Sequence, residues 1–212
     1  ASNPEAVVAD RGEELIRNRA EKLDRLRQQG IDPYPARYHR THAVAEALQA
    51  LRAAERSGEA PGRASVAGRI SSVRRMGKAA FLDLQDGTGR MQAHLRRDIL
   101  GDGYDLLKSL DLADHLGVEG PLLRTNSGEA TVEAHRITLL SKALRPPPEK
   151  RHGLRDVEQR LRQREVDLLS NDDARARFVL RSRLVEKIRK FLGGRGFIEV
   201  ESEIGRGSTF SF

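Results

Sequence analysis

The fold is decided by residues 66–95, which read VAGRISSVRRMGKAAFLDLQDGTGRMQAHL. Small or apolar residues recur there at every second position, the pattern of strands that bury one face. Three groups of such positions predict three strands, namely Val66, Gly68 and Ile70, then Leu82 and Leu84, then Met91, Ala93 and Leu95. Asp86-Gly87-Thr88-Gly89 predicts a hairpin loop between the second and the third strand.

The sequence beyond residue 95 continues this pattern. Leu116 and Val118 predict a fourth strand, and residues 130–134 predict a fifth, with a hairpin loop at Asn126-Ser127-Gly128 between them. Residues 104–110 predict a short helix between the third and the fourth strand. Five strands with a helix after the third are the arrangement of the OB-fold barrel, which binds oligonucleotides on its strand 2–3 face and loops.

The segments around the barrel predict helices. Residues 11–29 carry apolar side chains at helical spacing and end at Gly30, a C-cap candidate, and residues 42–56 predict a second helix. Arg145-Pro146-Pro147-Pro148 is a stiff linker. We therefore expect an α+β chain in three parts: a helical extension (1–62), the OB barrel (63–145), and a third part (146–212) that follows the barrel.

The third part combines helices with a strand. Residues 156–169 and 172–192 predict two helices, with Asn171 or Asp172 as the N-cap of the second. The glycines at 193, 194 and 196 end that helix, and residues 197–201 predict the start of a strand.

Composition narrows the function without deciding it. The net charge is +7 and the pI about 10.1, which favours a nucleic-acid partner, although an Arg-rich composition would give the same balance. Cys is absent, which excludes disulfides and thiolate metal sites and makes a reducing cytoplasm the expected location. The scattered His residues predict no metal site. The sequence shows neither an apolar run long enough to span a membrane nor signal-peptide features at its start.

The period-two pattern also places side chains on the outer face of the barrel. Because Leu82 and Leu84 face the core, Phe81 faces outward, and Gln92 and His94 do the same on the third strand. Glu129 opens the fifth strand on that face. An exposed ring can stack a base of single-stranded RNA, and polar groups beside it can read the edge of that base.

Three cations near the first turn complete this candidate face: Arg74, Arg75 and Lys78. They are placed to hold phosphates. The alternative is that Phe81 packs under the connector of residues 32–38, or under another loop, and that the charges are only solvated. Periodicity leaves both interpretations open.

Four stretches carry a family resemblance, and they read AEKLDRLRQQGIDPYP (20–35), VAGRISSVRRMGKAAFLDLQDGTGRMQ (66–92), GVEGPLLRTNSGE (117–129) and LLSKALRPPPEKRHGLRDVEQRLRQREVDLL (139–169). In this order and spacing they resemble the bacterial-type class II lysyl-tRNA synthetases, from about Glu13 to Glu201. The resemblance implies that the barrel binds the U-rich anticodon of a lysine tRNA. It further implies that the central and third bases are read by Arg74, a stacking Phe81, Gln92 and Glu129, with Arg75, Lys78 and His94 as supporting contacts.

The resemblance has departures. Leu161 and Glu165 stand where the family usually has Tyr, and Glu203 stands where the first class II motif ends in Pro. Residues 175–192 and 196–202 otherwise resemble that motif, which implies a homodimer through the C-terminal helix and strand. The second and third class II motifs, which hold ATP and lysine in the family, are not found. We therefore expect no catalytic residues and no cofactor in this chain, whereas the full-length family uses ATP and Mg²⁺.

Two alternatives to an anticodon-binding part of a lysine–tRNA ligase stay open at this point. One is a non-catalytic subunit that acts with a separate catalytic half, and the other is a non-functional truncation product. The tail GFIEVESEIGRGSTFSF (196–212) also resembles the last hairpin of a histidine-kinase ATPase domain. Its Gly205, Gly207, Ser208 and Thr209 make a poor phosphate loop, because no strand–loop–helix context or P-loop Lys accompanies them.

Overall fold

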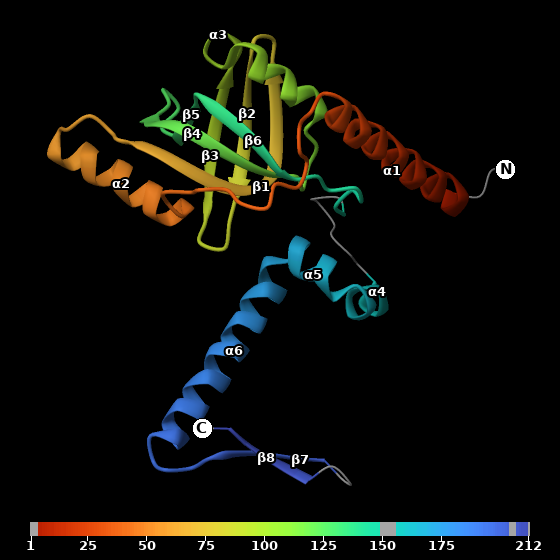
Figure 1. The fold of residues 1–212 in the computed structure, drawn as a ribbon, viewed down its shortest axis with the longest axis vertical. Coiled ribbons are helices and arrows are strands. Elements are labelled where there is room, and N and C mark those ends of the chain that lie inside the picture. The colour runs from red at the N-terminus through yellow and green to blue at the C-terminus, as the bar shows by residue number, and fades with distance from the viewer. Residues whose placement is uncertain (1–3, 149–155, 204–206, 212) are drawn as a thin grey trace. The chain divides into compact units, whose positions relative to one another are not determined.

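A computed structural model describes residues 4–148, 156–203 and 207–211. The chain divides into two compact units, unit 1 with residues 1–146 and unit 2 with residues 147–212, and the division falls inside the proline run. Unit 1 contains a barrel with helices around it (Figure 1). Unit 2 contains helices and a two-stranded sheet.

The barrel of unit 1 is a closed sheet of both parallel and antiparallel pairs. Its order is β1-β2-β3-β5-β4-β6, and a further pairing of β1 with β4 closes it. The five predicted strands are present as β1 to β5, and β6, a strand that the sequence did not predict, follows β5 after His135, whose N–H donates to the carbonyl of Glu119 at 2.8 Å. The expected five-stranded OB barrel is therefore confirmed. Its strands are β1 (Arg63–Met76), β2 (Ala79–Gln85), β3 (Arg90–Arg96), β4 (His115–Arg124), β5 (Ala130–Ala134) and β6 (Arg136–Ser141).

A β-bulge in β1 decides which side chains reach the outer face. Ile70 pairs with Leu84 and Ser72 with Asp83, so Ser71 is the extra residue. Strict alternation from Ile70 would have turned Arg74 toward the core. The bulge shifts the phase by one residue. Arg74 therefore lies opposite Phe81 on the outside of the barrel.

The core of unit 1 follows the predicted alternation on β2 and β3. Leu82, Leu84, Ala93 and Leu95 are fully buried, and Met91 is 2% exposed. Leu26 of α1 and three residues of α2 join this core, namely Val44, Ala47 and Leu51. The helices are α1 (Pro4–Gln28), α2 (Val44–Ser57), the single turn α3 (Arg97–Leu100) and the 3₁₀ segment η1 (Gly101–Ser109).

Two of these helices differ from expectation. The helical segment begins directly after β3, earlier than the helix predicted at 104–110. Its first turn, α3, ends at Gly101, whose φ is 53°, and the chain then continues as the 3₁₀ segment η1. The second helix begins at Val44 instead of residue 42. Its first N–H groups are capped from the β2–β3 hairpin loop, since Val44 N–H donates to Asp86 Oδ2 at 2.9 Å and Ala45 N–H to Thr88 Oγ1 at 3.0 Å.

The connector between α1 and α2 packs against β1, β4 and the end of β6. The ring of Tyr38 lies against Gly117 so closely that a Cβ there would come within 2.3 Å of it. Ser65 Oγ donates to the hydroxyl of Tyr38 at 2.9 Å, and the Tyr34 hydroxyl donates to the carbonyl of Lys142 at 3.0 Å. The connector contacts described here therefore involve strands other than the one that carries Phe81.

A buried ion network holds the end of the barrel to α1. Lys142 Nζ lies 2.6 Å from Asp111 and 2.7 Å from Asp114, and Lys22 Nζ lies 2.6 Å from Asp111. Arg19 donates to the carbonyls of Ala143 and Arg145. Burial opposes the ionisation of Asp111, but Lys142 and Lys22 lower its pKa overall. The residues just before the proline run are thus fixed to unit 1.

The described residues of unit 2 form three helices and a two-stranded sheet. The helix predicted at 156–169 is broken at Gln163, whose φ of −115° and ψ of 58° are not helical. Asn171 caps the long helix as predicted, since its Oδ1 accepts the N–H of Ala174 at 3.1 Å. The predicted strand begins at Glu199, and Gly205 lies outside the described residues. The elements are α4 (Val157–Arg162), α5 (Arg164–Ser170), α6 (Asp172–Gly193), β7 (Glu199–Glu203) and β8 (Gly207–Ser211).

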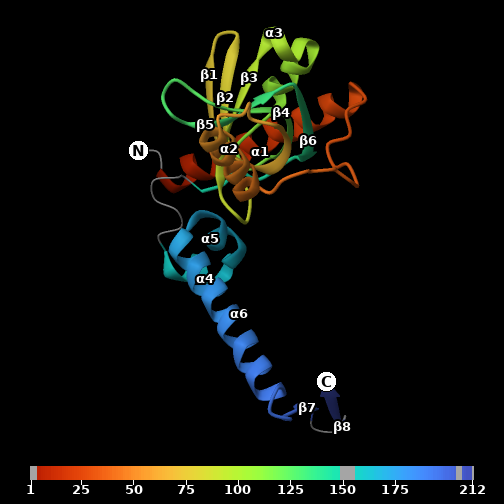
Figure 2. The same cartoon turned by 90° about the vertical axis from the view of Figure 1, so that its left-hand side faces the viewer.

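Figure 2 shows α6 as one extended helix between α5 and the hairpin. No helix in the described ranges is both long enough and apolar enough to cross a membrane. The same ranges hold no cluster of three or more His, Asp or Glu side chains that could bind a metal ion.

Candidate nucleic-acid interface

A row of side chains crosses the outer face of the barrel over four strands. In the ladder, Arg74 of β1 lies opposite Phe81 of β2, Phe81 opposite His94 of β3, and His94 opposite Glu133 of β5. The rings of Phe81 and His94 are stacked, with centroids 4.4 Å apart and planes 6° from parallel. Phe81 is half-buried, so part of its ring remains available to a base. The outward position predicted for Phe81 and His94 is confirmed.

His94 is well suited to act as a neutral ring in this stack. Burial lowers its pKa, and the nearby Arg96 lowers it further, against the opposing effect of Glu133. Glu133 lies 3.6 Å from Arg96 Nη1 and 3.6 Å from His135 Nε2. The ring of His94 therefore supports Phe81 without adding a positive charge near neutral pH.

The next row of the same face contains Gln92. It lies opposite Asp83 of β2 and opposite Thr131 of β5, which makes it the diagonal neighbour of Phe81. The expected outward phase is correct, but Gln92 is only 6% exposed, and Thr131 is fully buried. Thr131 Oγ1 donates to Gln92 Oε1 at 3.1 Å. This pairing depends on the parallel β3–β5 ladder, which periodicity within one strand does not reveal.

Glu129 stands at the rim of this row. The turn before β5 holds its backbone, since its N–H donates to Thr125 Oγ1 at 3.0 Å and its carbonyl accepts the Thr125 N–H at 3.0 Å. Its side chain is exposed. Glu129 lies two residues before Thr131 and directly before β5 begins at Ala130, so an extension of the strand's alternation places it on the same outward phase.

The predicted cations separate into two groups. Arg74 is exposed on the Phe81 face, and Lys78 is exposed in the β1–β2 turn. Arg75 lies opposite the buried Ala80, on the other phase of β1, and donates to the carbonyl of Leu107 at 3.0 Å. Arg75 is exposed like Arg74 but lies on the other phase of β1, so its role as a supporting RNA contact stays a prediction.

Two further cations, which were not among the predicted contacts, flank Lys78. Arg96 and Arg97 line a shallow depression together with Lys78, Met76 and Asp98. Arg96 shares the outward phase of His94 two residues earlier, so the same alternation could have identified it. Arg97 is held next to Lys78 by its backbone, since its N–H donates to the carbonyl of Lys78 at 3.0 Å.

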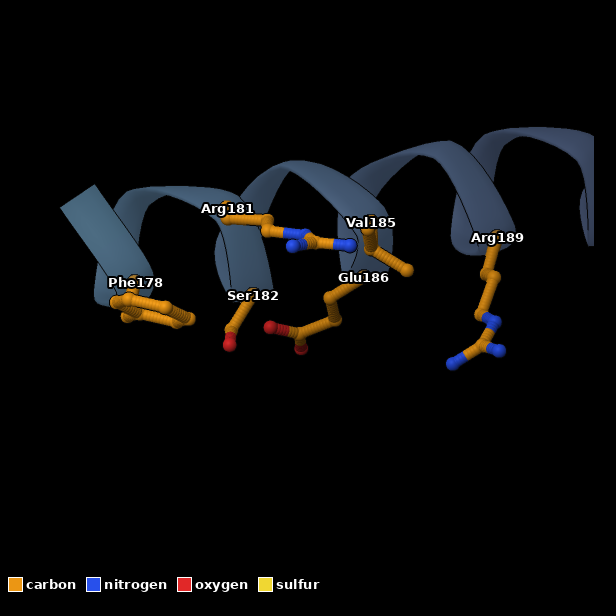
Figure 3. A pocket seen from close by; sticks show the side chains of 6 residues that line it. All are labelled: Phe178, Arg181, Ser182, Val185, Glu186 and Arg189. Atoms are coloured by element: carbon orange, nitrogen blue, oxygen red, sulfur yellow. The ribbon is translucent and has the colours of Figure 1, made fainter. Parts of the chain in front are cut away.

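A different kind of surface lies on α6 of unit 2. Most of its large apolar side chains are exposed, including Leu180 at 68%, Leu184 at 57% and Phe191 at 56%. One shallow depression is lined by α6 alone (Figure 3), and its residues are Phe178, Arg181, Ser182, Val185, Glu186 and Arg189. A cavity formed by a single helix is not enclosed, so this surface has the character of a packing face.

Comparison with known proteins assigns both parts of the chain. Residues 64–140 match the OB-fold nucleic acid binding domain, and residues 156–205 match the class II tRNA synthetases of the D, K and N group. The lysine–tRNA ligase of Dehalococcoides mccartyi is 45% identical over 194 residues, which are 91% of this chain and 39% of that protein. The lysine–tRNA ligase of Enterococcus faecalis is 44% identical over 96% of this chain and 41% of its own length.

The chain thus spans about two-fifths of the length of the curated relatives it matches. The class II match extends through β7 to residue 205, and nothing in the comparisons supports a histidine-kinase origin for the tail. A nucleic-acid-binding barrel followed by the start of a class II synthetase domain, with over 40% identity to lysine–tRNA ligases along nearly the whole chain, shows that this protein belongs to the lysine–tRNA ligase family, of which it carries the OB-fold domain and the start of the class II domain.

Proposed function

We propose that unit 1 binds the anticodon loop of a lysine tRNA on the outer face of β1, β2, β3 and β5. The stacked pair of Phe81 and His94 carries this proposal, because it is a supported aromatic platform at the centre of that face. A base would stack on Phe81, the polar row of Gln92 and Glu129 would read its edge, and Arg74 and Lys78 would hold phosphates.

The location of the platform supports this assignment over a purely structural role for Phe81. OB folds bind oligonucleotides on this face, and the matched residues 64–140 include it. The tRNA is the partner that the relatives' name, lysine–tRNA ligase, suggests. A U-rich anticodon suits a site that offers both a hydrogen-bond donor and an acceptor, as uracil requires.

The finer parts of the proposal concern the whole protein. In a complete ligase the class II domain would join lysine to tRNA with ATP and Mg²⁺, in the cytoplasm where translation supplies the tRNA. The exposed apolar side chains of α6 favour a contact with a second copy of the chain through α6 and β7. Analytical ultracentrifugation tests that contact, and a monomer at every concentration would contradict it.

The direct test of RNA binding replaces the platform ring. Base–aromatic stacking is worth about 1–3 kcal/mol per base, so Phe81→Ala should weaken binding of a lysine-type anticodon hairpin by roughly five- to a hundredfold. Fluorescence anisotropy with labelled hairpin RNA measures this. The fold should persist, because Phe81 lies outside the buried core.

Phe178→Ala is the matched control, since Phe178 is 40% exposed on α6 in unit 2. It removes the same ring from a surface outside the barrel and should leave RNA affinity unchanged. Equal binding by wild type and Phe81→Ala, or an equal loss in both variants, would remove the platform from the proposal.

A further inference from the structure

Gln92 and Thr131 form a hydrogen-bonded pair of side chains on the barrel. The two side chains face each other across the β3–β5 ladder on the proposed RNA face. Thr131 is fully buried, and its hydroxyl lies 3.1 Å from Gln92 Oε1 and 3.2 Å from the carbonyl oxygen of Glu129. A hydroxyl has a single proton, so it can donate fully to only one of these two acceptors.

The competition between the two acceptors favours Gln92. The carbonyl of Glu129 already accepts the backbone N–H of Thr125 at 3.0 Å. Among the described residues, the Thr131 hydroxyl is the donor that the structure gives to Gln92 Oε1. A nearly buried amide oxygen without a donor would cost about 1–3 kcal/mol. The Thr131 hydroxyl therefore donates its hydrogen bond to Gln92 Oε1, and this hydrogen bond fixes the orientation of the amide.

The amide nitrogen of Gln92, Nε2, is then the group that this residue offers to a ligand. No side-chain N or O atom buried within the described part of the chain lacks a hydrogen-bond partner. Since none of the described residues is a hydrogen-bond partner of Gln92 Nε2, this nitrogen is not a buried orphan and reaches the surface of the face. A glutamine amide that could rotate would offer either a donor or an acceptor, whereas this one offers N–H donors only.

A Gln92 that offers only N–H donors can distinguish the two pyrimidines, because uracil and cytosine present opposite donor and acceptor groups on their pairing edges. Uracil presents the O4 acceptor beside the N3–H donor, and cytosine presents the N4 amino donor beside the N3 acceptor. A fixed N–H donor from Gln92 suits O4 of uracil and opposes the amino group of cytosine. The exposed carboxylate of Glu129 at the rim of the same face supplies the acceptor that N3–H needs.

We propose that Thr131 is a positioning residue that holds Gln92 as a hydrogen-bond donor and thereby makes the face prefer uracil over cytosine. The proposal rests on the proposed function, because it presupposes that a base reaches this face. Thr131 itself touches no ligand. It acts through the amide that it orients.

The test measures a ratio of affinities with the full chain. Two synthetic RNA hairpins, identical except for uracil or cytosine at the central loop position, are titrated against wild type, Thr131→Val and Thr131→Ser. A wrong base costs wild type about tenfold in affinity. Thr131→Val keeps the shape but removes the hydroxyl, so the ratio should fall toward one, and Thr131→Ser should restore it. A purely structural role would weaken both hairpins equally and leave the ratio unchanged.

Gln92→Glu provides an independent arm, which decides the matter even if Thr131→Val fails to fold. It keeps the acceptor for Thr131 but replaces the amide donor by a carboxylate oxygen, so the preference should shift toward cytosine. A wild-type ratio in Thr131→Val, or an unchanged uracil preference in Gln92→Glu, overturns the proposal. Loss of both hairpins in Phe81→Ala would still uphold anticodon binding, so the two failures are distinguishable.

Discussion

Unit 1 and unit 2 bury their apolar side chains to very different degrees. In unit 1, Leu82, Leu95 and Val118 are fully buried inside the closed sheet. In unit 2, α6 buries only Ala174 among its described side chains and exposes Leu184 at 57%. A closed sheet covers its own apolar face, whereas a helix needs a second element to cover its stripe. The comparison identifies unit 1 as the self-sufficient part and α6 as a packing surface.

The polar contacts of the two units differ in the same way. In unit 1, Lys142 pairs with Asp114, 28 residues away, and Lys22 pairs with Asp111, 89 residues away. In unit 2, Asp167 pairs with Arg160 and Arg164, seven and three residues away. Unit 1 therefore has ion pairs that join distant parts of the sequence, whereas the ion pairs of Asp167 in unit 2 lie within about two helical turns.

The largest expected effect comes from removing the same side chain in each unit. The three Tyr residues, at 34, 38 and 104, all lie in unit 1 and the chain has no Trp, so tyrosine fluorescence follows unfolding of unit 1 alone. Leu82→Ala should lower the free energy of unfolding of unit 1 by about 2–5 kcal/mol, because the cavity lies in a closed core. Leu184→Ala should change it by less than about 0.5 kcal/mol. Similar urea midpoints for both variants would contradict the comparison.

A smaller effect tests the contact between α2 and the β2–β3 loop through its pH dependence. Burial opposes the ionisation of Asp86, but the N–H groups of Val44, Thr88 and Gly89 and the Thr88 hydroxyl lower its pKa overall. A carboxyl with a lowered folded pKa stabilises the fold above its unfolded pKa, about 3.9, and this contribution is lost as the pH falls through the folded value. Asp86→Ala should therefore cost about 0.5–2 kcal/mol at neutral pH and progressively less under more acidic conditions.

Urea unfolding of unit 1 at neutral and at acid pH measures this difference. Asp167→Ala is the control, since the pKa of Asp167 is also lowered, by Arg160 and Arg164, but within unit 2. It should leave the tyrosine-detected transition unchanged. A cost of Asp86→Ala that stays constant down to acid pH would show that the carboxylate charge has no part in capping α2.

The smallest expected effect concerns phosphate contacts. Lys78 is exposed beside the platform, and Lys187 is exposed on α6. If RNA binds the barrel face, Lys78→Ala should weaken all hairpins alike and reduce the slope of log affinity against log salt by about one. Lys187→Ala should leave that slope unchanged, because α6 is not part of the proposed face. The opposite result would move the RNA from unit 1 to unit 2.

The sequence predicted much of the barrel because its strands are individually periodic. The alternation around Leu82 and Met91 placed Phe81 and His94 outward, and the Asp86–Gly89 loop predicted the hairpin that brings them together. The helix break at Gln163 was missed, since its neighbours all carry helix-compatible residues. The start of α2 was missed because its cap comes from Asp86, more than forty residues away.

The sequence by itself therefore determined strands β1 to β5, the core faces of β2 and β3, and the family, which depend on local period and on the order of motifs. Only the tertiary structure decided which polar groups meet. The bulge at Ser71 sets Arg74 opposite Phe81 and Arg75 opposite Ala80, and the parallel pairing of β3 with β5 sets Thr131 against Gln92. Both follow from register between strands, which is fixed by the closure of the whole sheet, so no period within a single strand encodes them.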